Sequence, residues 1–193
     1  MFNGCTSLTT APSILPATTL ADYCYERMFR DCTSLTSAPE LPATTLAWGC
    51  YDNMFYGCTS LTTAPSLPAT TLADGCYSCM FWGCVSLTTA PELPATTLAS
   101  NCYYDMFDFC ESLTTAPVLP ATTLADNCYA QMFSNCSSLD TIKLGYIGPF
   151  DPMIFDIWVQ GVASEGTFYY NGTDTTIGES AIPEGWTVTP FTS

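Results

Sequence analysis

The stretch Met54–Cys79, MFYGCTSLTTAPSLPATTLADGCYSC, is one copy of a motif that recurs through most of the chain. A Met-Phe pair opens each copy, and these pairs begin at Met1, Met28, Met54, Met80, Met106 and Met132. The steps are 27, 26, 26, 26 and 26 residues, and the first is longer because APSILP has one residue more than APELP. A fixed period of this size is typical of stacked structural repeats. Five units and part of a sixth therefore occupy residues 1–144.

The second half of the unit predicts an amphipathic helix. In TLADGCYSCMFWGC, apolar residues recur at every fourth position from Leu72 to Cys84, which is close to helical spacing. Thr71 is a suitable N-cap residue, and Asp74 follows it at the spacing of a capping box. Gly83 can adopt the left-handed conformation that ends many helices. We therefore expect a helix between Thr71 and Gly83, and its equivalent in every unit.

The first half of the unit predicts a short strand. In SLTTAPSLP, Leu61 and Ala64 recur in each full unit and are flanked by Thr, which favours a pleated surface. The prolines that follow prevent a long strand. One strand, one Pro-rich turn and one helix per 26 residues predict an α/β solenoid with a parallel sheet on one side.

Residues 145–193 depart from the repeat and are expected to form a C-terminal cap over the last unit. Asp151–Val162 can form a helix with Pro152 at an early position, where proline is tolerated. Asn171-Gly172 is typical of a hairpin turn. A second turn at Pro183–Gly185 precedes a short final strand. The predicted organisation is a repeat domain, 1–144, followed by a capping segment, 145–193.

The repeat resembles a known family. MFNGCTSL at Met1, MFYGCTSL at Met54 and the following LPATTLA are similar to the BspA-like leucine-rich repeats, in their 26-residue bacterial surface-protein variant. The resemblance covers residues 1–144 and implies a leucine-rich-repeat-like solenoid on a bacterial cell surface, used for adhesion or host contact. Similar repeats also occur in gut-phage proteins. The chain opens inside a repeat and shows no signal peptide, so we expect a fragment of a longer extracellular protein.

Composition narrows the function further. The 193 residues include 18 Asp and Glu, three Lys and Arg and no His, for a net charge of −15. Nucleic-acid binding requires a basic surface, which three cations do not provide. No apolar run approaches the roughly 18 residues of a membrane span. With no histidine and no catalytic motif, we expect a protein that is not an enzyme and that uses no cofactor or metal.

Eleven of the twelve cysteines form two ladders at the repeat period. One ladder lies within the expected helices, at Cys24, Cys50, Cys76, Cys102 and Cys128; the other follows them, at Cys5, Cys32, Cys58, Cys84, Cys110 and Cys136. A disulfide requires Cα atoms within about 6.8 Å, whereas neighbouring helices pack roughly 8–10 Å apart. We therefore favour buried free thiols over a disulfide framework.

Cys79 is the one cysteine outside the ladders. With Cys76 it forms a C-x-x-C pair, but a zinc site would need a second pair. Its equivalents in other units are polar, at Arg27, Asn53, Asp105 and Gln131. We therefore predict that Cys79 is an exposed thiol.

Positions that vary between units are candidates for ligand binding, since the invariant positions build the repeat. Large aromatic residues occupy variable positions at Trp48, Tyr56, Trp82 and Tyr104, and also at Tyr23. Trp and Tyr are enriched in binding hot spots. The first four are the predicted ligand-binding residues, and Tyr56 and Trp82 should be neighbours in adjacent units. The alternative is that each ring lies flat over apolar surface between helices.

Two further groups of residues are weaker candidates. The strand face is mostly Thr and could bind carbohydrate, although a solvated sheet surface explains it as well. Asp105, Asp108 and Glu111 offer oxygen ligands suited to calcium, but surface acids also keep proteins soluble. The sequence thus predicts an extracellular adhesion module for a protein or carbohydrate partner. The alternative is a phage structural or host-attachment protein in which the repeats are a scaffold.

Overall fold

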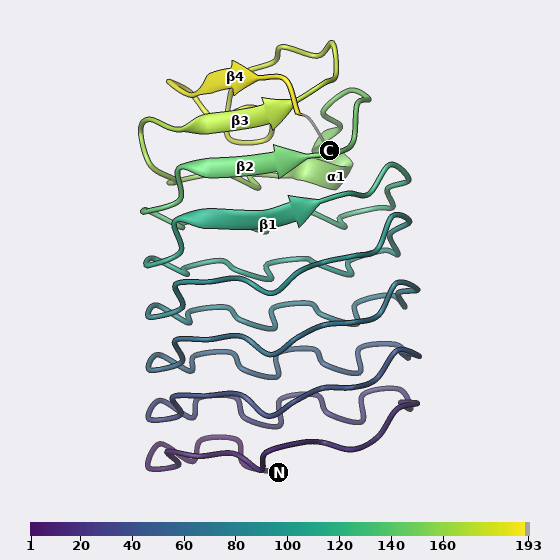
Figure 1. Cartoon of the computed structure of the whole chain (residues 1–193), viewed down its shortest axis with the longest axis vertical. Helices are drawn as coiled ribbons and strands as arrows, with labels where there is room; N and C mark the ends of the chain where they lie inside the picture. The colour runs from purple at the N-terminus through teal and green to yellow at the C-terminus, as the bar shows by residue number, and fades with distance from the viewer. Residues whose placement is uncertain (192–193) are drawn as a thin grey trace.

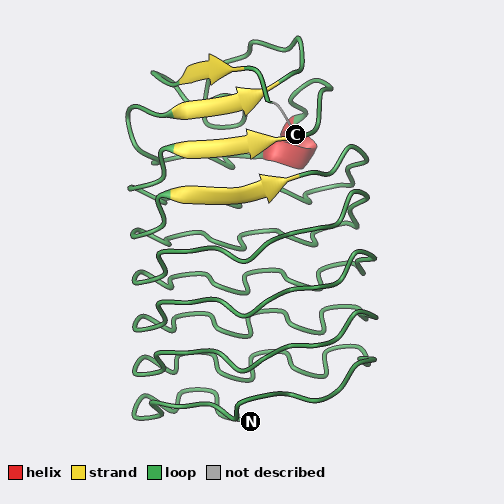
Figure 2. Ribbon diagram, viewed as in Figure 1, coloured by secondary structure: helices red, strands yellow, loops and turns green. Residues whose placement is uncertain are grey.

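The computed structural model describes residues 1–191 and shows a stack of coils, one for each repeat unit (Figure 1). Its regular strands are β1 (Thr115–Leu119), β2 (Thr141–Leu144), β3 (Thr167–Tyr170) and β4 (Thr187–Thr189), which form one parallel sheet in that order. The helix α1 spans Pro152–Phe155. The fold thus has a four-stranded parallel sheet and almost no helix (Figure 2).

The sheet continues toward the N-terminus as isolated parallel bridges between residues that are 26 positions apart. These bridges join Ile14 to Glu40, Thr19 to Thr45, Thr45 to Thr71, Ser37 to Thr63, Thr63 to Thr89 and Thr97 to Thr123. Prolines interrupt each segment and remove ladder donors. The parallel pairing that the sequence predicts is therefore present, but in fragments through most of the stack.

The predicted helix in each unit is wrong. The segment around Gly75, Cys79 and Gly83 has positive φ at these three residues, +61°, +51° and +68°. The N–H groups one residue later close turns by donating to carbonyls three residues back: Cys76 to Ala73 at 3.2 Å, Met80 to Tyr77 at 3.2 Å and Cys84 to Phe81 at 3.0 Å. A positive φ at the third residue is characteristic of type II turns. Three such turns in succession replace the helix.

Every other N–H group of this segment, which we call the turn run, points to the next coil, whereas the N–H groups of Ser78 and Trp82 also close turns within the segment, to Gly75 O and Cys79 O at 3.2 Å. Tyr77 donates to the carbonyl of Cys102 at 3.1 Å, Cys79 to Tyr104 at 2.8 Å and Phe81 to Met106 at 3.0 Å. Each coil is therefore hydrogen-bonded to its neighbours through the turn run as well as through the strand segment. The backbone groups that a helix would pair internally are paired between coils instead.

The strict four-residue period explains why the turn run forms. An α-helix advances 400° in four residues, so a period of four drifts by about 40° at each step and about 120° over three steps. In a run of four-residue turns, residues four positions apart remain on the same side of the segment. Cys76 and Tyr77 form one buried pair, and Met80 and Phe81 form the next. The two residues between the pairs are partly exposed.

The predicted helix caps make a different contact. Asp22 and Asp74 do not close a helix; their carboxylates accept hydrogen bonds from the backbone N–H of Trp48 at 3.1 Å and of Ser100 at 3.0 Å, each in the following coil. The sequence pattern predicted that this carboxylate accepts a hydrogen bond from a backbone N–H group that has no other partner. The N–H that it reaches belongs to the next repeat.

Two aromatic ladders run through the core. Phenylalanine rings stack at 5.5–5.8 Å from coil to coil, at Phe2, Phe29, Phe55, Phe81, Phe107 and Phe133. Tyrosine rings stack beside them at 5.7–6.2 Å, at Tyr25, Tyr51, Tyr77, Tyr103 and Tyr129. The buried Trp158 contacts the last ring of both ladders and donates its indole N–H to Ala181 O at 2.8 Å. It closes the core at the C-terminal end.

The C-terminal segment follows its predictions in part. Asp151 caps α1 by accepting from Met153 N at 2.9 Å, but the helix ends at Phe155 rather than Val162. The predicted Asn171-Gly172 hairpin is wrong, because β3 and β4 run parallel. The predicted last turn and strand are confirmed, since Trp186 N donates to Pro183 O immediately before β4.

The sign of the stability change caused by the substitution Gly75→Ala distinguishes a turn from a helix. In an exposed helix, Gly75→Ala would stabilise the protein by about 1 kcal/mol. At a φ of +61° with no atom within 4 Å of an added Cβ, it should instead destabilise by about 1 kcal/mol through backbone strain alone. Denaturant unfolding measures the difference.

Gly75→Asn is the matched control. Asn101 and Asn127 occupy the equivalent place with φ near +55°, so Asn should be tolerated better than Ala. A gain in stability for Gly75→Ala would contradict the turn run.

Candidate functional site

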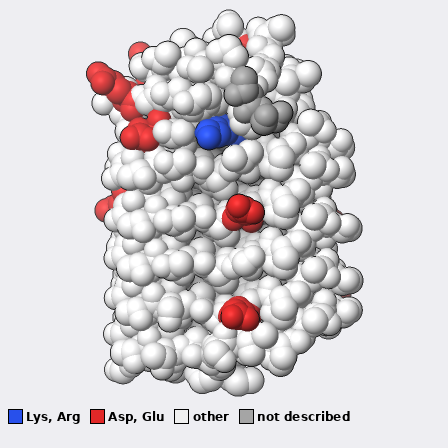
Figure 3. Space-filling view, in the orientation of Figure 1, with Lys and Arg blue, Asp and Glu red and all other residues white. Residues whose placement is uncertain are grey.

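The face that carries the strands is mostly uncharged, with isolated acidic side chains and a basic one along its middle and more acidic side chains at its edge (Figure 3). Exposed threonines cover it, and their hydroxyls are turned toward the preceding coil: Thr62 Oγ1 lies 3.5 Å from Thr36 O, and Thr88 Oγ1 lies 3.5 Å from Thr62 O. Two shallow hollows of about 230 and 320 Å³ lie between neighbouring Pro-rich segments on this side. The threonine side chains are thus partly hydrogen-bonded to the preceding coil, and the charges beside them include Glu40 and Glu92, which line the two hollows.

Tyr56 and Trp82 are neighbours, as predicted. Their ring centroids lie 4.3 Å apart with an interplanar angle of 5°. The Arg30 guanidinium lies 4.4 Å from the Tyr56 centroid, and the Trp82 indole donates to the Asp108 carboxylate at 2.9 Å. Phe109 packs against Trp82 at 5.1 Å. These contacts match the alternative reading, in which the rings cover the surface between coils.

Trp48 is the most open of the predicted ligand-binding residues, at 55% exposure. It packs against Tyr23, itself 42% exposed, with centroids 4.9 Å apart and a tilt of 53°. The Tyr23 ring covers Gly49, where an added Cβ would approach the ring to 2.6 Å. The equivalent Gly75 on the next coil has nothing above it within 4 Å. Open surface therefore lies beside Gly75, in the coil that follows Trp48.

Tyr104, the fourth predicted residue, is partly buried, and its hydroxyl accepts a hydrogen bond from Gln131 at 2.8 Å. The structure therefore does not gather the four residues into one site. Tyr23, which the sequence marked as aromatic but which was not among the four, belongs with Trp48. The variable positions in the sequence identified the aromatic residues on the surface. Contacts between rings of adjacent coils determine which of these side chains are exposed.

Asp105, which is partly buried, and Asp108, which is buried, form an acidic pair. Burial, with the charge of Asp108 second, raises the pKa of Asp105 to about 7, and its Oδ1 is buried without a hydrogen-bond partner. Asp108 is 6% exposed and bonded by Trp82 and by Asn135 Nδ2 at 3.0 Å. Within residues 1–191 no group of three or more His, Cys, Asp or Glu side chains is arranged to hold a metal ion.

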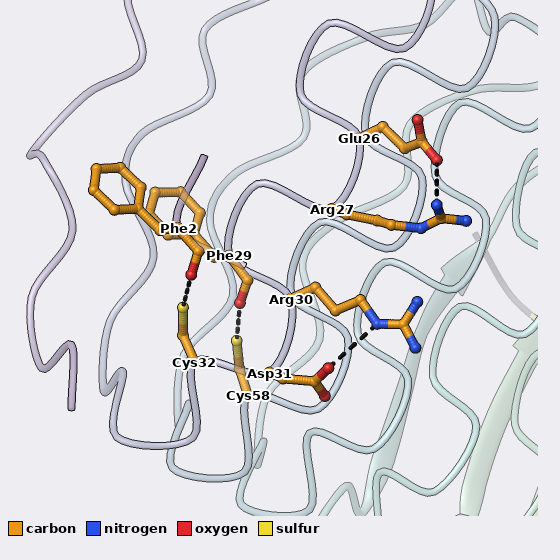
Figure 4. A network of polar contacts seen from close by, with 8 residues as sticks. All are labelled: Phe2, Glu26, Arg27, Phe29, Arg30, Asp31, Cys32 and Cys58. Carbon is orange, nitrogen blue, oxygen red and sulfur yellow. Dashed lines mark hydrogen bonds and ion pairs between the residues drawn. The ribbon is translucent and has the colours of Figure 1, made fainter. Parts of the chain in front are cut away.

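All twelve cysteines are free, as the sequence predicts. From Cys32 onward, each thiol of the second ladder donates a hydrogen bond to a phenylalanine carbonyl of the preceding coil, for example Cys58 to Phe29 at 3.1 Å and Cys32 to Phe2 at 3.0 Å (Figure 4). Burial raises the pKa of Cys58 to about 12 and that of Cys84 well above its ordinary value. These thiols are therefore protonated donors within the core.

The prediction for Cys79 needs correction. Cys5 and Cys24 are exposed, whereas Cys79 is partly buried, with Sγ 3.9 Å from Asp105 Oδ2. Burial first, and nearby carboxylates second, raise its pKa to about 12. Its polar equivalents indicated an outward position, but the side chain lies against the next coil.

Comparisons with protein-family models, curated proteins and solved structures give no match. Within residues 1–191, no helix has the length and hydropathy needed to cross a membrane.

Thiol labelling tests this assignment. A thiol reagent should modify Cys5 and Cys24 quickly and Cys79 slowly in the native protein, and the nine buried cysteines only after unfolding. Mass spectrometry of digests locates the label. Fast native labelling of Cys58 or Cys84 would contradict the buried ladder, and unreactive cysteines in denaturant would indicate disulfides.

The raised pKa of Asp105 predicts that stability depends on pH. The folded state holds the proton more tightly than the unfolded state, so the Asp105 contribution is most favourable below about pH 4 and is lost as pH rises through about 7. Asp105→Asn should therefore stabilise the protein at pH 8 by about 1–2 kcal/mol, allowing for partial solvent screening. It should have little effect at pH 4.

Denaturant titrations at both pH values provide the measurement. Asn53 already occupies the equivalent place in an earlier coil, so the substitution suits the backbone, with φ of +55° at Asn53 and +53° at Asp105. The same free-energy difference at pH 4 and pH 8 would show that the carboxylate does not titrate in this range.

Proposed function

We propose that the chain is a leucine-rich-repeat-like solenoid that acts as an extracellular binding or adhesion module of a bacterial surface protein. The observation that carries the proposal is the division between core and surface. Every coil repeats the same Phe, Tyr and Cys ladders, while outward columns differ from coil to coil. A rigid stack whose surface varies side chain by side chain is suited to recognition.

The most open aromatic surface is the pair Tyr23 and Trp48, so this pair is the proposed contact. Exposed Tyr and Trp provide large contact area at low entropic cost. The partner is a protein or a glycan. The same proposal holds that the protein is not an enzyme and needs no cofactor.

A binding screen with a variant pair tests the proposal. The protein is applied to a glycan array and to a panel of host matrix proteins, beside Trp48→Ala and Trp82→Ala. A ligand lost with Trp48→Ala but retained by Trp82→Ala supports recognition at the open pair. Circular dichroism and thermal unfolding show whether each variant is folded.

A screen without any ligand for the folded wild type would overturn the proposal and would favour the scaffold alternative. In that case the stack is a spacer whose neighbours lie within its own assembly, as in a phage particle. A ligand lost only with Trp82→Ala would also overturn the assignment of the contact to Trp48.

A further inference from the structure

The charged side chains of the turn runs point to the chemistry of the partner. The protein carries three cationic side chains, and each is engaged within the chain. Arg27 Nη1 lies 3.2 Å from Glu26 Oε1, and Arg30 Nε lies 3.3 Å from Asp31 Oδ2 (Figure 4). Lys143 lies 5.4 Å from the Tyr169 centroid. The remaining carboxylates of a chain with net charge −15 have no basic side chain of their own.

Arg30 provides a pattern for how this surface holds a cation. Its guanidinium lies over the Tyr56 ring at 4.4 Å and is paired with the Asp31 carboxylate. A guanidinium is favoured over an aromatic face and by a carboxylate at its edge. An aromatic ring in one coil and a carboxylate in the coil before it are sufficient for this arrangement.

The same elements surround Trp48, but without a cation. Asp22, Trp48 and Asp74 occupy one column in three successive coils, so an exposed acidic residue holds the equivalent position in the coil on either side of the exposed Trp48. The Asp22 carboxylate is fixed at the base of Trp48 by its bond to the Trp48 N–H. Tyr23 covers one side of the indole, while the surface above Gly75 is open.

We propose that the surface formed by Tyr23, Trp48, Asp22 and Asp74 binds an arginine or lysine side chain of a basic protein partner. This rests on the proposed binding function and specifies its ligand. Charge complementarity selects this occupant, because the two carboxylates attract a cation and raise the cost of an anionic ligand. A neutral sugar could stack on the indole and donate hydroxyl hydrogen bonds to the carboxylates, but it would form no ion pair with them.

The indole N–H signals of the four tryptophans give a residue-specific test. Trp82, Trp158 and Trp186 donate to Asp108, Ala181 and Ala163, respectively, so their environments are fixed within the fold. The probe is the peptide acetyl-Gly-Arg-Gly-Arg-Gly-amide, added to the ¹⁵N-labelled protein. The control probe replaces arginine by citrulline, which has nearly the same shape and no charge.

We expect the arginine peptide to shift the Trp48 signal saturably and to leave the other three indoles unchanged. Trp48→Ala should weaken binding, followed by backbone amide signals near Gly75, by about three- to five-fold, which is the scale of an exposed cation–π contact. Asp74→Asn should weaken it by about two- to five-fold. Asn retains the oxygen that accepts from Ser100, so the fold is preserved.

Glu165→Gln is the matched control, since it removes one exposed charge in the capping segment, three coils further along the stack. If Glu165→Gln and Asp74→Asn weakened peptide binding equally, the effect would come from the net negative charge of the protein and not from a local contact. This result would overturn the proposed site. Equal binding of the citrulline peptide, or an unchanged Trp48 signal, would overturn it as well.

The binding screen separates the two proposals. A glycan or matrix-protein ligand that is lost with Trp48→Ala, together with no response to the arginine peptide, keeps the binding function and overturns the cation assignment. No ligand in the screen and no response to the peptide would overturn both.

Discussion

The backbone hydrogen bond between one coil and the next is the interaction on which the structure depends. In the turn run, the N–H of a residue donates to the carbonyl 25 positions later, as in Tyr77 to Cys102 and Phe81 to Met106. Because the turns use every other amide, no coil satisfies its backbone alone. Burial of the Phe and Tyr ladders then adds the apolar contribution that holds successive coils at a fixed spacing.

Such stacking brings equivalent side chains close together, which constrains the surface as well as the core. Identical aromatic rings gain from stacking, but identical charges repel. Carboxylates accordingly alternate with uncharged residues along two columns: Asp22, Trp48, Asp74, Ser100, Asp126; and Glu40, Ser66, Glu92, Val118. Where acids do become neighbours, as at Asp105 and Asp108, the pKa of each carboxyl is raised, first by burial and, for Asp105, also by the charge of Asp108.

Much of this organisation could be predicted from the sequence. The repeat period, the parallel pairing, the free thiols and the contact between Tyr56 and Trp82 all follow from spacing, because a fixed period places equivalent residues side by side. The helix could not be excluded by eye, since a period of four and one of 3.6 differ little over a single step. We interpreted Gly83 as a helix end, yet Gly49, Asn53 and Gly57 place glycine or asparagine at every fourth residue, which indicates recurrent left-handed backbone.

The candidate site was less predictable for a different reason. Column analysis identified the aromatic positions, but exposure depends on the partner in the adjacent coil. Trp82 is covered because Tyr56 precedes it and Asp108 follows it in the same column, whereas Trp48 packs against Tyr23 on one side and stays 55% exposed. The polar residues equivalent to Cys79 in other units did not predict its burial for the same reason. The exposure of a side chain depends on its neighbour in the adjacent coil, not on the usual residue type at that position.

The sequence separation between paired residues of adjacent coils also shows where a repeat unit can tolerate a change in length. Near Thr9 and Thr36 the pairing offset is 27 residues, but by Ile14 and Glu40 it is 26, so the extra residue is absorbed within the Pro-rich segment. Between β1 and β2 the offset falls from 26 to 25 in the same part of the coil. A one-residue insertion in the turn run would instead move one residue of each buried pair outward, and it would exchange the amides that close turns with those that bond to the next coil. Duplication or loss of a whole 26-residue unit preserves every contact type, so recombination between repeats can lengthen or shorten the protein without a new folding problem.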